Sequence, residues 1–119
     1  MDKSTKLYKE IVDDLAQLHK GVHRKWVTKL GWPKLPENEN INSFIGKLSQ
    51  DEKEILVSLL ESARDGGIHD TLVRLNDRMN IEGLRFVENG IEMAHEPFDT
   101  DLYYDWVCRR EGDSWPDEI

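Results

Sequence analysis

The chain has 119 residues and is expected to form a single small domain over residues 1–119. Its one cysteine, Cys108, excludes an internal disulfide and favours a reducing compartment such as the cytoplasm. Its formal net charge of −8, from 24 acidic and 16 basic residues, disfavours binding to nucleic-acid phosphates and to anionic membrane surfaces. The longest uncharged apolar run, residues 55–60, is far shorter than the roughly 20 residues of a membrane span.

The hydrophobic pattern of the first third predicts a long amphipathic helix over residues 4–30, with Ser4 as its N-cap. Its apolar face repeats at steps of three and four residues: Leu7, Ile11, Leu15, Leu18, Val22 and Trp26. Residues 31–42 contain two prolines and three asparagines and are predicted to form a loop. A short helix is expected next, over residues 43–48.

The next helix has the clearest start signal in the chain. Ser49 and Glu52 have the spacing of a capping box, in which each side chain bonds the other residue's backbone N–H. The helix is predicted to end at Gly66-Gly67, because glycine commonly terminates helices. A further helix is expected over residues 68–79.

A β-hairpin is predicted over about residues 84–95, turning at Asn89-Gly90. A two-residue type I′ turn there pairs Glu88 with Ile91 and places four apolar residues on one face: Leu84, Phe86, Ile91 and Met93. A last helix is predicted over residues 100–110, with Asp99 or Thr100 as its N-cap. The fold class is therefore α+β, mainly α, with four to five helices packed against one β-hairpin before the C-terminal helix.

Histidines are the strongest candidates for a metal site. His19 and His23, four residues apart, would share one helix face, and His69 or His95 could complete a shell for a divalent metal. Each histidine could equally be an ordinary residue at the edge of the core. Otherwise no catalytic or cofactor motif is found, and Cys108 is expected to be a structural thiol.

Two tryptophans lie outside the predicted helices, and each precedes a proline. Trp32 in the loop and Trp115 in the C-terminal segment could anchor a protein partner, because tryptophan dominates many interfaces. The alternative, which we favour, is that each folds back to cover the core.

Residues 63–72, and residues 104–110 with the following Gly112 and Trp115-Pro116, resemble a family of small uncharacterised bacterial proteins. The resemblance implies a bacterial cytosolic protein with no assigned activity, and it transfers no catalytic residue. If these stretches mark a surface, its candidate residues are His69, Asp70, Asp105, Arg109 and Trp115. Alternatively, Arg109 pairs with Asp105 one turn away and both only stabilise their helix.

Together these patterns favour a non-enzymatic accessory or binding protein that acts through protein–protein contact, with a basic protein as its partner. The candidate partner-binding residues are Trp32, Asp70, Arg109 and Trp115. The alternative is a metal-binding helical protein or metal-dependent enzyme that uses His19 and His23. The wide apolar face of the first helix would also suit a homodimer.

Overall fold

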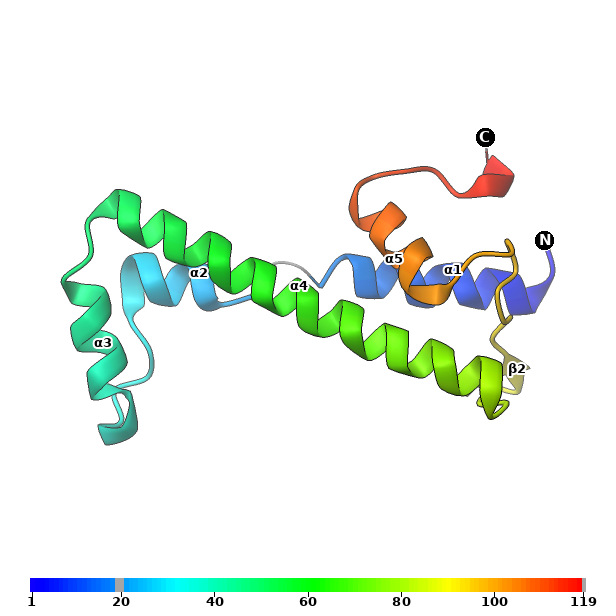
Figure 1. The fold of residues 1–119 in the computed structure, drawn as a ribbon, viewed down its shortest axis with the longest axis horizontal. Helices are drawn as coiled ribbons and strands as arrows, with labels where there is room; N and C mark the ends of the chain where they lie inside the picture. The colour runs from blue at the N-terminus through cyan, green and yellow to red at the C-terminus, as the bar shows by residue number, and fades with distance from the viewer. Residues whose placement is uncertain (19–20, 119) are drawn as a thin grey trace. The chain divides into compact units, whose positions relative to one another are not determined.

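The computed structural model describes residues 1–18 and 21–118, and most of these residues are helical (Figure 1). The elements in chain order are α1 (Lys3–Ala16), α2 (His23–Lys25), the π-helix η1 (Trp26–Leu30), the 3-10 helix η2 (Pro36–Asn38), α3 (Glu39–Gly46), α4 (Gln50–Ile81), β1 (Val87–Glu88), β2 (Ile91–Glu92), α5 (Leu102–Arg110) and the 3-10 helix η3 (Pro116–Glu118). The predicted class, α+β and mainly α with a hairpin before the C-terminal helix, is confirmed.

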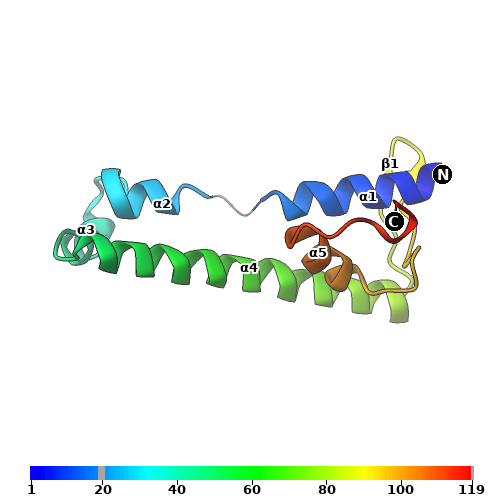
Figure 2. The same ribbon diagram turned by 90° about the horizontal axis from the view of Figure 1, so that it is seen from above.

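The chain packs as two compact units. We call Met1–Leu18 with Gly66–Ile119 unit 1, and His19–Asp65 unit 2. In unit 1, α1 packs along α5 and contacts β2 (Figure 2). Its buried core consists of Leu7, Tyr8, Val12, Ala16, Leu72, Met79, Met93, Leu102, Trp106 and Trp115. Unit 2 has a smaller core of Val27, Ile45 and Val57, covered by Trp32, Leu56 and Leu60.

The prediction of one continuous helix over residues 4–30 is wrong. Helix α1 ends at Ala16, and α2 and η1 form separately after it. The apolar stripe is not one packing face, since its early members belong to the core of unit 1 and Val27 belongs to the core of unit 2. Leu18 and Val22, which the prediction placed on the same stripe, are 48% and 53% exposed, so burial stabilises a helix at neither residue.

Helix α4 is continuous from Gln50 to Ile81, so the prediction that Gly66-Gly67 ends a helix is wrong. Neither glycine has the positive φ that a glycine helix end requires. Residues on both sides of the pair are buried, Val57 in unit 2 and Leu72 in unit 1, and this packing outweighs the low helix propensity of glycine. Among the residues that the structure describes, no helix combines the length and apolarity needed to cross a membrane.

The hairpin is confirmed in place and register. Glu88 pairs with Ile91, and the Met93 N–H donates to the Phe86 carbonyl over 2.8 Å. Asn89 and Gly90 have φ of 51° and 78°, as a type I′ turn requires. All four residues of the predicted apolar face pack into the core of unit 1.

Helix ends follow the predictions in part. The capping box of Ser49 and Glu52 is confirmed, with its two bonds at 3.1 and 2.8 Å. Asp2, not Ser4, caps α1 by accepting from the Thr5 N–H. Helix α3 begins at Glu39, four residues before the predicted start at residue 43.

The start of α5 is set by a buried residue of α4, and neither Asp99 nor Thr100 is its N-cap. Asp101 occupies the cap position but makes no side-chain capping bond. Instead, Asn76, which is 2% exposed, accepts from the Leu102 N–H over 3.0 Å and donates to Asp101 over 3.2 Å. This side chain therefore joins α4 to α5 within unit 1.

Candidate functional site

A buried carboxylate lies at the centre of the polar contacts in unit 1. Asp105, on α5, is 4% exposed and accepts hydrogen bonds from the Tyr8 hydroxyl over 2.5 Å and the Thr100 hydroxyl over 2.6 Å. Burial of Tyr8, and then its bond to Asp105, raise the pKa of the Tyr8 phenol well above its ordinary value. No salt bridge to Asp105 forms within residues 1–18 and 21–118, so this carboxylate is bound only by neutral hydroxyl groups.

A cavity of about 400 Å³ opens beside Asp105, between α5 and residues 113–116. Its lining includes Thr100, Asp105, Cys108, Arg109, Ser114 and Trp115. A hydrogen bond with the Cys108 thiol raises the pKa of the Tyr104 phenol, which lies on the same wall. The cavity thus combines a buried carboxylate with the chain's one thiol.

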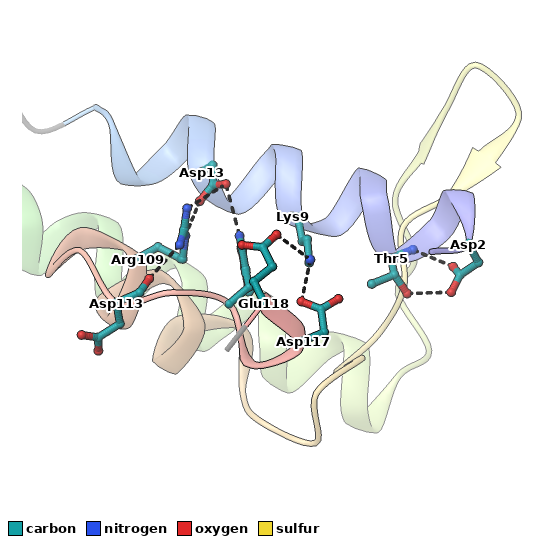
Figure 3. A network of polar contacts seen from close by, with 9 residues as sticks. Asp2, Thr5, Lys9, Asp13, Arg109, Asp113, Asp117 and Glu118 are labelled. Carbon is teal, nitrogen blue, oxygen red and sulfur yellow. Dashed lines mark hydrogen bonds and ion pairs between the residues drawn. The ribbon is translucent and has the colours of Figure 1, made fainter.

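Arg109 and Trp115 are both bound by one aspartate of α1. The Arg109 guanidinium donates to the two carboxylate oxygens of Asp13 over 2.7 and 3.3 Å (Figure 3). The indole N–H of Trp115 also donates to Asp13, over 3.3 Å. The guanidinium also lies over the Trp115 ring, 5.0 Å from its centroid. Arg109 therefore pairs with Asp13 and not with Asp105, the alternative raised by the sequence.

A second ion pair fastens the C-terminal segment to α1. The buried Lys9 ammonium donates to Asp117 over 2.7 Å and to Glu118 over 3.1 Å (Figure 3). Burial lowers the pKa of Lys9, but the bonds to the two carboxylates raise it by more, so the net pKa lies above its ordinary value. Lys9 is therefore held in its charged form.

The predicted partner-binding residues lie in different surroundings. Trp115 is 3% exposed, which supports the interpretation that it covers the core. Trp32 is half-buried in unit 2, and Arg109 is bound to Asp13. Asp70 is exposed on α4, beside the ring of His69.

The histidines proposed as metal ligands also differ in surroundings. His19 lies outside the described residues. His23 stacks on Trp32 in unit 2, with ring centroids 6.1 Å apart. His69 packs edge-on against Tyr103 in unit 1. Within the described part of the chain, no group of three or more histidine, cysteine or acidic side chains is arranged to hold a metal; the metal site stays a prediction that depends on His19.

An asparagine of α3 holds the backbone of Trp32 in the loop of unit 2. The Trp32 N–H donates to the Asn42 side-chain oxygen over 2.7 Å, and the Asn42 amide donates back to the Trp32 carbonyl over 3.2 Å. Gly31, with φ of 76°, precedes this clamp, and a Cβ there would lie 2.9 Å from the same oxygen. Asn42 thereby holds the Trp32 ring against Trp26, with centroids 5.1 Å apart.

Replacing Asn42 with alanine is expected to destabilise unit 2 by about 1–3 kcal/mol, because two backbone groups of Trp32 lose their partners. The tryptophan fluorescence should shift to longer wavelength as Trp32 gains solvent. The control is Asn40→Ala, at an exposed residue of the same helix. Equal effects of the two substitutions would show that the clamp contributes nothing.

Charge is divided unevenly between the units. Residues 19–65 contain eight basic and seven acidic residues, a net charge of +1. The remaining residues, which form unit 1, contain eight basic and seventeen acidic ones, a net charge of −9. Glu88, Glu92 and Asp99 are exposed members of this acidic set and form no ion pair in the described structure. The acidity of the chain is thus a property of unit 1.

The comparisons with known proteins add a family but no activity. Residues 1–117 match the model described as a family of unknown function, DUF6547. No curated protein and no solved structure matches the chain.

Proposed function

The chain belongs to the family of unknown function DUF6547, and we propose that it is a non-enzymatic accessory protein of the bacterial cytoplasm that binds a basic protein partner through unit 1. The observation that supports this proposal most directly is the charge of −9 in unit 1 against +1 in unit 2. Unpaired exposed carboxylates attract a basic surface and raise the association rate.

The ion pairs of unit 1 favour the same interpretation. Arg109 and Lys9, two of its eight basic residues, are already bound to Asp13 and to Asp117 and Glu118. The exposed carboxylates Glu88 and Glu92 lie on the hairpin, on either side of its turn at Asn89-Gly90. They are therefore available to a partner without the loss of an internal contact.

The test compares two matched charge variants in affinity purification from the native host. The unit 1 variant is Glu88→Gln, Glu92→Gln, Asp99→Asn, and the unit 2 variant is Glu37→Gln, Glu39→Gln, Asp51→Asn; all six residues are exposed. Each removes three negative charges.

We expect the wild-type chain and the unit 2 variant to retain the same basic protein at about 50 mM salt, and the unit 1 variant to lose most of it. Binding should fall steeply at about 500 mM salt, because screening weakens exposed charge interactions. Equal retention by the two variants, or retention of no basic protein by the wild-type chain, would refute the proposal.

A further inference from the structure

We propose that the cavity beside Asp105 binds a small cationic group, an alkylammonium or a guanidinium. This site goes beyond the proposed partner binding, since a free amine could fill it without any protein partner. The observation that supports the proposal is that Asp105 is almost fully buried and lines a cavity, and that no basic side chain among residues 1–18 and 21–118 forms a salt bridge with it.

The charge of Asp105 is the first reason. Buried carboxylates are normally paired with a cation, because removing an unpaired charge from water is costly. Among the residues that the structure describes, Asp105 is bound by the side-chain hydroxyls of Tyr8 and Thr100, which bring hydrogen bonds but no positive charge. A carboxylate offers about four lone-pair sites, so two of them remain for a ligand.

The charges of the other lining residues point the same way. Arg109 also lines the cavity, but Asp13 already neutralises its guanidinium through two hydrogen bonds. Asp113 is a second acidic residue in the lining. An anion entering the cavity would meet Asp105 and Asp113, whereas a cation would meet an uncompensated negative charge.

The size of the cavity suits a small ligand. A volume of about 400 Å³ lies within the usual range for small-molecule sites. A nitrogen cation at Asp105 would form a charge-assisted hydrogen bond there. The aromatic and apolar parts of the lining, from Trp115 and Pro116, suit the hydrocarbon body of an alkylammonium.

Nuclear magnetic resonance titration of the full chain tests the site directly, with n-butylammonium and ethylguanidinium as probes and n-butyrate as the anionic control. We expect both cations to shift amide signals of residues 100–116, with a Kd on the order of millimolar for ligands of this size. Butyrate should leave these signals in place. Equal shifts with butyrate, or no shift with either cation, would overturn the proposal.

Two substitutions with the same charge change locate the effect. Asp105→Asn should weaken the binding of n-butylammonium about tenfold or more, because the charged acceptor is lost. Asp99→Asn removes the same charge at an exposed residue with φ of 59°, which asparagine accepts readily, and should leave the Kd unchanged. Equal weakening by both variants would show a general charge effect and no site.

A variant that leaves Asp105 intact guards against loss of folding. Ser114 is an exposed residue of the cavity lining, and Ser114→Phe would place an aromatic ring in the cavity. This variant should no longer bind n-butylammonium, while its circular dichroism spectrum and Tm should stay near those of the wild-type chain. Unchanged binding in a folded Ser114→Phe variant would place the cation elsewhere.

A further probe, Nα-acetyl-lysine methylamide, separates two sources of the cation. Tighter binding of this probe than of n-butylammonium assigns the site to a side chain of a protein, and weaker binding assigns it to a free amine.

Cys108 gives an independent measure of the same charge, because it is the chain's one thiol and lines the cavity. The thiol can be modified by the cationic 2-aminoethyl methanethiosulfonate and by the anionic 2-sulfonatoethyl methanethiosulfonate. The rate with the cationic reagent divided by the rate with the anionic one should be several-fold higher in the folded protein than in the urea-unfolded chain. This rate ratio should be lower in the Asp105→Asn variant and unchanged in the Asp99→Asn variant. Equal ratios in the folded and unfolded wild-type chain would contradict the proposed site.

Discussion

Replacement of Trp115 with alanine is expected to lower the free energy of unfolding of unit 1 by about 3–5 kcal/mol, the usual range for removal of a buried aromatic side chain. The indole is 3% exposed and packs against the rings of Tyr8 and Phe98, with centroids 6.0 and 5.5 Å away. Its N–H also donates to Asp13. The measurement is urea unfolding followed by circular dichroism, with hydrogen exchange of the α1 and α5 amides to assign the loss to unit 1.

Two control variants separate packing from other effects. Trp115→Phe keeps an aromatic ring and loses the bond to Asp13, so its cost should be smaller, about 1–2 kcal/mol. Val87→Ala, at a side chain that is 64% exposed in the same unit, should change stability by about 0.5 kcal/mol or less. A loss below about 1 kcal/mol for Trp115→Ala would mean that residues 113–118 do not dock on α1 in solution.

The double substitution Gly66→Ala, Gly67→Ala is expected to raise the free energy of unfolding by roughly 1–2 kcal/mol. Both glycines lie inside the continuous helix α4, and among the described residues no atom beyond the neighbouring residues and the helix's own nearby backbone lies within 4 Å of a Cβ built on either one. Alanine therefore gains helix propensity without a clash. Thermal unfolding followed at the helical signal measures the change.

Gly90→Ala is the matched control, because Gly90 has φ of 78° in the hairpin turn, where alanine is strained. It should lower stability although the space around it is equally open. If either helical glycine behaves like Gly90, with a loss on replacement by alanine, then α4 is not a regular helix at this point in solution.

The accuracy of the sequence predictions depends on how local the determining interactions are. The hairpin and the capping box were predictable because each is specified by neighbouring residues, the Asn89-Gly90 turn and the pair Ser49 and Glu52. The ends of the first helix and of α4 were not, because burial in two separate cores decided them. Gly66-Gly67 is a strong local stop signal that tertiary packing overrides.

The polar centre of unit 1 was only partly predictable. The resemblance drew attention to Asp105 and Arg109, but Tyr8 and Asp13, which bind them from α1, lie 97 and 96 residues away. Sequence spacing carries no information on such distant pairs. A usable signal was present on α1, where Lys9 and Asp13 stand four residues apart beside the apolar stripe, and each binds the C-terminal segment.

The composition of unit 1 from both ends of the chain has a consequence for its synthesis. Leu7 and Tyr8 are translated before residues 19–65, but Trp106 and Trp115, which complete their core, are translated after them. Residues 19–65 are all present long before that moment, so unit 2 can fold while translation continues. Unit 1 must wait until Trp115 has been translated, and until then the apolar face of α1 is open to chaperones and to neighbouring nascent chains.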